Sequence, residues 1–205
     1  MKFILTLSLF FFAVIIHEYA HGWVAWKRGD STAKFMGRLT LNPIAHIDPI
    51  GTIILPLMLL ITRSPIVFGW AKPVPVDFYN LNNPKKDMIL VGLAGPAANI
   101  ILAIALSLVI KIPVIGNIHL LASILNSAVI INLVLAVFNM IPIPPLDGSR
   151  VLMGLLPASA GMQYAQLEPY GFIIIFALLW MNIIGYMIWP VVSLLAGLLG
   201  ANMGM

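Results

Sequence analysis

The sequence predicts an all-α, polytopic membrane protein. Of its 205 residues, 61% are hydrophobic and only 9% are charged, whereas a soluble domain of this size carries about 25% charged residues. Several charge-free stretches reach the length of about 20 helical residues that crosses a bilayer core. We therefore expect one integral-membrane domain over residues 1–205, with a three-helix core, additional transmembrane or re-entrant helices, and short β-strands near the cytoplasmic face.

Three segments are long and apolar enough to form the core helices. They cover residues 3–26, residues 88–110, and the latter part of residues 112–146. Lys2 followed by an apolar run resembles the start of a secretory signal. No small-x-small cleavage pattern follows it, so we expect the segment to remain as a transmembrane helix.

The remaining apolar segments are shorter or interrupted. Residues 49–62, broken by Pro56, and residues 151–167, broken by Pro157, are too short to span and are expected to be re-entrant or partly buried. The uncharged stretch from Pro169 to Met205 is compatible with one helix kinked at Pro190, or with a helix and a short returning piece.

Two segments between apolar runs have the character of strands. Residues 31–40 and 66–79 are rich in β-branched residues, show alternation and are punctuated by proline. We expect short strands in both.

The eleven basic residues lie almost entirely between the apolar runs. By the positive-inside rule, residues 27–48 and 63–87 are cytoplasmic, which places the N-terminus outside. The end of the first helix, the start of the second and the end of the third then meet at one depth, toward the cytoplasmic face. The basic segments indicate contact with the lipid bilayer and its anionic headgroups, and we expect no nucleic-acid partner.

The first apolar run contains the motif HEYAH, residues 17–21. His17 and His21 are four residues apart, so on a helix they share one face with Glu18 beside them. Two such imidazoles can bind one zinc ion, and the glutamate can reach a water at the metal. A pair of histidines satisfied in a helix bundle is the alternative. That alternative does not explain Glu18, because a carboxylate at the centre of a membrane helix costs about 2.5–3.5 kcal/mol of insertion free energy.

A tetrahedral zinc site needs a further protein ligand. The chain has no cysteine, so the ligand must be His, Asp or Glu. Asp147 lies in NMIPIPPLDGSR, residues 139–150, where proline-rich backbone follows the third core helix. The predicted topology brings it to the depth of His17, although Asp147 could instead cap a short helix beginning near Ser149.

Taken together, HEYAH in the first core helix, GPAAN at residues 95–99 and NMIPIPPLDG at residues 139–148 resemble the site-2 proteases, which are zinc intramembrane metalloproteases. The resemblance covers the three-helix core of that family in the right order. LNPIAHIDPIGT and FGWAKPVPV further resemble its compact prokaryotic branch. Members of that branch lack an inserted PDZ or CBS domain, and no segment here is long and polar enough to be one.

The resemblance implies one Zn²⁺ per chain, bound by His17, His21 and Asp147, with Glu18 as the general base. It also implies a substrate-binding role for Asn139, which would hold the substrate backbone or the developing oxyanion. Asn99 receives such a role more weakly, because helix packing explains it equally well. His46 and Asp48 could lie near the entrance to the site, and His46 could compete for the metal, but a loop role beside proline is the simpler interpretation.

The implied function is hydrolysis of peptide bonds within or near the transmembrane segments of single-span proteins, in a prokaryotic inner membrane with the active site toward the cytoplasm. A substrate helix must unwind before cleavage, and residues 66–79 or 31–40 could accept it by β-addition. Residues 49–62 could line or gate the path of water. A divalent-cation transporter and a non-catalytic scaffold remain alternatives. The transporter predicts polar groups strung across the membrane, and the scaffold would not need Glu18.

Overall fold

The computed structural model describes residues 2–62 and 69–202, and it is built from helices. Three of them are long and apolar enough to cross a membrane: α1 (Lys2–Lys27), α4 (Pro84–Ile110) and α6 (His119–Asn139). A bent pair of helices near the C-terminus adds a fourth candidate span. The prediction of an all-α polytopic membrane fold with a three-helix core is confirmed.

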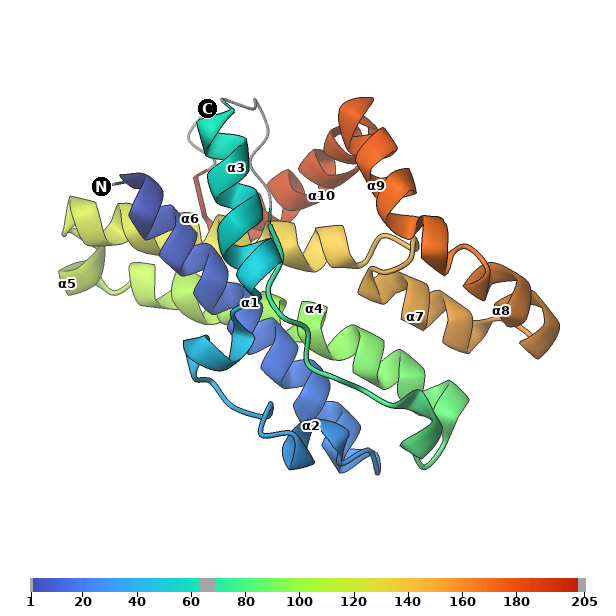
Figure 1. Cartoon of the computed structure of the whole chain (residues 1–205). Helices are drawn as coiled ribbons and strands as arrows, with labels where there is room; N and C mark the ends of the chain where they lie inside the picture. Colours follow the sequence, from blue (N-terminus) through green and yellow to red (C-terminus); the bar gives the residue numbers. More distant parts are fainter. Residues whose placement is uncertain (1, 63–68, 203–205) are drawn as a thin grey trace.

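Helix α4 is the centre of the molecule. It packs against α1, α6 and the shorter α7 (Asp147–Leu155), as the crossing of these helices in Figure 1 shows. Small residues permit the close approach, as is common between membrane helices. A Cβ added at Gly92 would lie only 3.1 Å from the carbonyl oxygen of Asp147. The packing of α4 thus brings the start of α7 close to α1.

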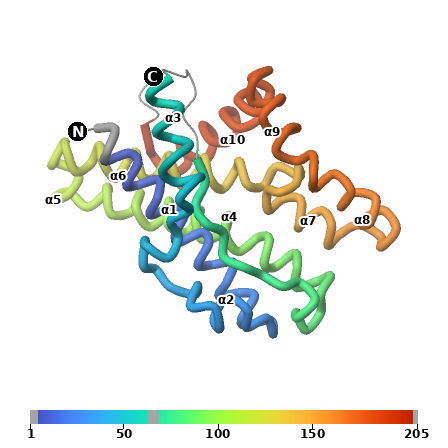
Figure 2. The backbone as a smooth tube through the Cα atoms, viewed as in Figure 1, coloured from blue at the N-terminus to red at the C-terminus, as the bar shows by residue number. Residues whose placement is uncertain are grey.

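The C-terminal part forms two helices with a sharp bend. After α8 (Ala158–Ala165) and the short η4 (Glu168–Tyr170), helices α9 (Gly171–Trp180) and α10 (Ile183–Leu199) meet at 77°. The bend is clear in Figure 2. It lies at Asn182, whose φ of 57° is left-handed, a conformation that asparagine tolerates better than most residues. Pro190, predicted as a possible kink, lies inside α10.

The C-terminal helices complete the apolar core, because α10 packs against α6. The buried side chains of this core come from α4, α6, the segment after α6, α9 and α10; they are Ala103, Val129, Leu133, Ile141, Leu146, Ile175, Ile184, Ile188, Val192 and Ala196.

The two interrupted apolar segments are too short to span, as predicted. Residues 49–62 form a π-helical turn, η2 (Pro49–Ile54), that continues into α3 (Leu55–Ile61). Several of its side chains, including Leu57 and Ile61, are exposed, so this segment is less buried than we expected. Residues 151–167 are divided at Pro157 between α7 and α8. The other short helices are α2 (Thr32–Phe35), η1 (Pro43–His46), η3 (Phe78–Asn80) and α5 (Pro113–Gly116).

The predicted strands are wrong, because the structure contains no β-strand within residues 2–62 and 69–202. Residues 31–40 form α2 and turns. Of residues 66–79, the first three lie outside the described residues. Residues 69–77 belong to no helix or strand and run as an extended segment between α3 and η3 (Figure 1). Pro73 and Pro75 have no N–H group for a ladder, and the N–H of Val74 donates to the carboxylate of Glu18 instead.

Residues 69–77, which we name the strap, are held along α1 by two buried charged side chains. Arg38 donates from Nη2 to the carbonyl oxygens of Lys72 (2.8 Å) and Pro73 (3.2 Å). Asp30 accepts from the N–H of Asp77 at 2.8 Å. Burial opposes ionisation of Asp30, but the hydrogen bonds from Thr32 and Asp77 outweigh it and lower the pKa of this carboxyl below its usual range. The strap is therefore fixed at both of these points.

Candidate metal centre

Helix α1 presents both histidines of HEYAH on one face. His17 and His21 are one turn apart and are only 5% and 7% exposed. Their Nε2 atoms lie 3.0 Å from each other. The predicted i, i+4 geometry is thus present, and both rings turn the same nitrogen toward a common point.

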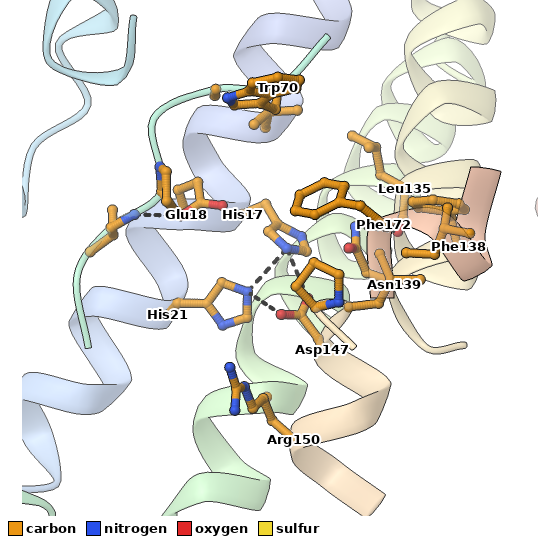
Figure 3. A pocket seen from close by; sticks show the side chains of 18 of the residues that line it. His17, Glu18, His21, Trp70, Leu135, Phe138, Asn139, Asp147, Arg150 and Phe172 are labelled. Carbon is orange, nitrogen blue, oxygen red and sulfur yellow. Dashed lines mark hydrogen bonds and ion pairs between the residues drawn. The ribbon is translucent and has the colours of Figure 1, made fainter. Parts of the chain in front are cut away.

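Asp147 reaches that point from the first residue of α7. Its Oδ2 lies 3.0 Å from His17 Nε2, and its Oδ1 lies 3.2 Å from His21 Nε2. Figure 3 shows the carboxylate facing the two imidazoles. One ligand atom from each of the three residues lies within 4.8 Å of the others. The structure therefore brings together the three residues that the sequence predicted as metal ligands.

The other ring nitrogens decide what this cluster can hold. His17 Nδ1 lies 2.6 Å from Asn99 Oδ1, and His21 Nδ1 lies 2.7 Å from the carbonyl oxygen of Val91. Since both partners are acceptors, each Nδ1 carries the proton and each Nε2 presents a lone pair.

The two lone pairs face a carboxylate. Among the described residues, nothing donates a hydrogen bond to the buried Oδ2 of Asp147. A cation bound between these three groups would satisfy all of them. Imidazole and carboxylate ligands suit zinc, and a three-ligand site leaves a position open for chemistry. The residues present fit the metal.

Asn99 lies behind His17 in α4 and is fully buried. Its Nδ2 donates to the carbonyl oxygen of Ala13 (3.2 Å) and to Asn132 Oδ1 (2.7 Å). These two bonds fix which way the amide points, so that Oδ1 faces His17. Asn132 of α6 was not predicted, although a polar residue within an apolar span is itself a signal of function.

Gly95 explains how α4 passes so close to the histidines. A Cβ at this position would lie 2.5 Å from His17 Nε2, nearer than side-chain atoms approach one another. The GPAAN motif therefore supplies two features one helical turn apart. Gly95 leaves room for the imidazoles, and Asn99 orients one of them.

Glu18 lies beside the metal cluster, and the strap holds it. Its Oε2 accepts a hydrogen bond from the N–H of Val74 at 2.7 Å. One carboxylate oxygen is thereby anchored, and Figure 3 shows this contact on the side of α1 that faces the strap. Val74 could not be found from the sequence, because it contacts Glu18 through its backbone N–H.

The cluster opens into a largely apolar cavity of about 720 Å³. Asn139, Glu18 and the three clustered residues lie on its wall, and Asn139 Nδ2 donates to the carbonyl oxygen of Leu135 (3.0 Å) in its own helix. The strap and α9 supply much of the remaining wall, including Trp70, Val74, Phe172, Phe176 and Trp180.

The other candidate residues lie elsewhere. Among the described residues, Asn99 is not part of the cavity wall. His46 is fully buried, its Nε2 lies 2.8 Å from the carbonyl oxygen of Thr40, and it is outside the metal-binding group found in the described residues. Asp48 accepts from the N–H groups of Ile50 and Gly51 and so caps η2.

Comparison with known proteins identifies the family. The model of peptidase family M50 matches residues 109–182. "Putative zinc metalloprotease YwhC" of Bacillus subtilis (strain 168) is 40% identical over 185 residues, which are 87% of this chain and 81% of the relative. The chain belongs to peptidase family M50, the site-2 proteases. A second relative, "Putative zinc metalloprotease Rip2" of Mycolicibacterium smegmatis, is 28% identical to this chain over 177 residues. The matched residues are 86% of this chain and 67% of the relative.

A more distant relative is "Zinc metalloprotease MJ0392" of Methanocaldococcus jannaschii, which is 28% identical over 156 residues, 75% of this chain and 34% of the relative. No solved structure gives a significant match. This family M50 member is a multi-pass membrane metalloprotease that uses Zn²⁺, and its substrates are peptides.

Proposed function

We propose that this chain is an intramembrane zinc protease that hydrolyses peptide bonds within or near the transmembrane segments of single-span proteins, as in regulated intramembrane proteolysis. The observation that carries the proposal is the position of the metal cluster. His17, His21 and Asp147 converge in an apolar cavity whose walls include α1 and α6, two helices long enough to span a membrane. Such a cavity suits an apolar segment better than a polar peptide.

In this proposal His17, His21 and Asp147 hold the zinc, and Glu18 is the general base. Zinc supplies Lewis acidity, which polarises a carbonyl and eases the deprotonation of water. Glu18 accepts the proton from the attacking water and later delivers it to the leaving amine. Because its Oε2 is anchored to Val74 N, the other oxygen, Oε1, is the atom assigned to carry that proton.

The two asparagines receive different roles. Asn139 lines the cavity, and its Nδ2 uses one of two N–H groups on Leu135, so the second can donate to substrate. We assign Asn139 to the substrate backbone or the developing oxyanion. For Asn99 the contact with His17 favours an orienting role over the substrate contact expected from the sequence.

The strap is the candidate surface for an unwound substrate. It is extended, it lines the cavity with Trp70, Ala71, Val74 and Val76, and it lies beside Glu18. A substrate laid along it would present a backbone carbonyl near the metal cluster. Residues 31–40, the other candidate, are helix and turns and offer no such surface.

The whole of residues 1–205 is proposed to act as one integral-membrane protease domain. The positive-inside rule, applied to its basic segments, supports an active site toward the cytoplasmic side of a prokaryotic inner membrane. This orientation is tested by attaching impermeant thiol reagents to single cysteines introduced at Lys34 and at Lys111, because the native chain has no cysteine. Labelling of the Lys111 position from outside and of the Lys34 position only after lysis supports the assignment.

The deciding experiment for the function compares the parent and Glu18→Gln in detergent against a panel of single-span helices. Cleavage by the parent and none by the variant, with one zinc per chain in both, supports the proposal. Cleavage that survives in the variant refutes the assigned base. Zinc flux into proteoliposomes without cleavage supports a transporter, and binding of single-span helices without turnover supports a scaffold.

A further inference from the structure

One charged residue on the cavity wall has no part in the proposed chemistry. Arg150 lines the cavity and is its only Lys or Arg among the described residues. It lies three residues after Asp147 in α7, which places both side chains on the same face of that helix. Figure 3 shows its guanidinium extending toward the side of the cavity where His21 lies. The Arg150 guanidinium can therefore contact a substrate that occupies the cavity.

Two partners hold the guanidinium in a defined orientation. Glu168 of η4 accepts from Nη2 (2.5 Å) and from Nη1 (3.3 Å), a two-point pair. The ring of Phe78, just after the strap, lies 5.3 Å from the guanidinium carbon. Arginine suits such recognition because its planar fork matches a carboxylate and its face stacks on aromatic rings.

The pair with Glu168 is partly exposed to solvent and is therefore exchangeable. The side chain of Glu168 is 43% exposed, and that of Arg150 is 24% exposed. Exposed pairs contribute little stability. A second carboxylate entering along the strap can therefore compete with Glu168 for the guanidinium.

We infer that Arg150 is a specificity-determining residue that binds a carboxylate of the substrate in place of Glu168. The inference rests on the proposed function and names its substrate class: an apolar segment that carries a carboxylate about one or two residues from the cleaved bond. That spacing follows because Arg150 is one helical turn from Asp147, while an extended peptide advances about 3.3 Å per residue. The carboxylate belongs either to an Asp or Glu side chain or to a free C-terminus.

The test uses a series of single-span segments with an amidated C-terminus. Each segment carries one Asp at a different position near the cleaved bond, and each is compared with the segment that has Asn at the same position. In a second arm, neutral segments are truncated so that a free C-terminus falls at those positions, compared with the amide. Cleavage gives kcat/KM in the parent, and binding is measured by fluorescence anisotropy in zinc-loaded Glu18→Gln.

At one position we expect the acid to be preferred over its neutral counterpart by roughly three- to tenfold, in cleavage and in binding. Arg150→Gln should bring this ratio to about one, and Arg150→Lys should restore part of it. Glu168→Gln should raise the ratio, because it removes the internal competitor. The matched control is Lys86→Gln, since Lys86 is exposed on α4 and outside the cavity wall; it should leave the ratio unchanged.

A merely structural ion pair predicts the opposite pattern, in which Arg150→Gln and Glu168→Gln both weaken acidic and neutral segments alike. That result overturns the inference, as does the absence of an acid preference in both arms. If Arg150→Gln does not fold, the direction of the change in Glu168→Gln decides. Cleavage without a preference for the acid would refute the role of Arg150 and leave the proposed protease function standing. Preferential binding of the acid without cleavage would refute the protease function and leave the role of Arg150 standing.

Discussion

Replacing Asn99 by alanine tests whether hydrogen bonding behind a ligand sets the zinc affinity. The side chain is fully buried and accepts from His17 Nδ1 at 2.6 Å. In the proposed zinc site His17 must keep its proton on Nδ1, because Nε2 is the atom assigned to the metal. Without Asn99 that N–H is buried with no acceptor. In the metal-free protein the ring can move its proton or rotate, so the cost falls mainly on the bound state.

The magnitude follows from two independent figures. A buried donor left without an acceptor costs about 1–3 kcal/mol. Loss of a hydrogen bond to a metal-binding histidine typically lowers metal affinity by about 10- to 100-fold, which corresponds to about 1.4–2.8 kcal/mol. The two ranges agree, so we expect Asn99→Ala to weaken zinc binding by about 10- to 100-fold. Asn132→Ala, which removes one of the two partners of the Asn99 amide, should have a smaller effect.

The assay is competition for zinc with a chromophoric chelator in detergent at fixed pH, with thermal unfolding measured in parallel. Asn126→Ala is the matched control, because Asn126 lies on the same helix as Asn132 but pairs with Asn202 instead. Zinc affinity within about twofold of the parent, in a variant that remains folded, would refute the orienting role of Asn99.

Three further predictions concern the surroundings of the site. Gly95→Ala should abolish tight zinc binding, measured as zinc content after dialysis, because its Cβ would lie 2.5 Å from His17 Nε2. Gly51→Ala would displace the indole of Trp70. If η2 and the strap control access of water and substrate to the cavity, this change should lower cleavage by up to about 100-fold while the zinc content stays the same. Full activity would show that they do not control access. The folded protein lowers the pKa of Asp30 below its ordinary value of 3.8, so the ionised carboxylate stabilises the fold. This stabilisation is complete above pH 3.8 and is lost as the pH falls through the lowered pKa of the folded state. Thermal unfolding of Asp30→Asn should therefore depend less on pH below about 4 than that of the parent.

The grouping of the three proposed metal ligands could be predicted because their spacing and setting are both restrictive. Two histidines four apart on a membrane helix have few other uses, and Asp147 stands out in a chain with only seven acidic residues. The three spanning helices were equally accessible, because bilayer thickness sets their length. In each case a single physical constraint acts on a short stretch of sequence.

The strap and the C-terminal bend could not be predicted in the same way. Alternation in residues 69–77 correctly indicates an extended backbone, but a strand also needs a partner strand. Here the backbone pairs instead with the side chains of Glu18, Arg38 and Asp30 and with the carbonyl oxygens of Gly51 and His46. The bend at Asn182 depends on one left-handed residue, whereas Pro190 is accommodated inside a helix. Such outcomes are decided by tertiary contacts that no local pattern encodes.

The same contacts couple the assigned base to the substrate-lining segment. Glu18 is anchored through Val74 N, and the strap on which Val74 lies is held by Arg38 on one side and Asp30 on the other. Neither of these two residues is part of the cavity wall among the described residues, yet both set where the Glu18 carboxylate rests. A substrate that displaces the strap must also move or release the Glu18 carboxylate. Under the proposed function, seating of the substrate and placement of the base are therefore one structural event, and we expect segments that fit the strap to be cleaved in preference to those that merely enter the cavity.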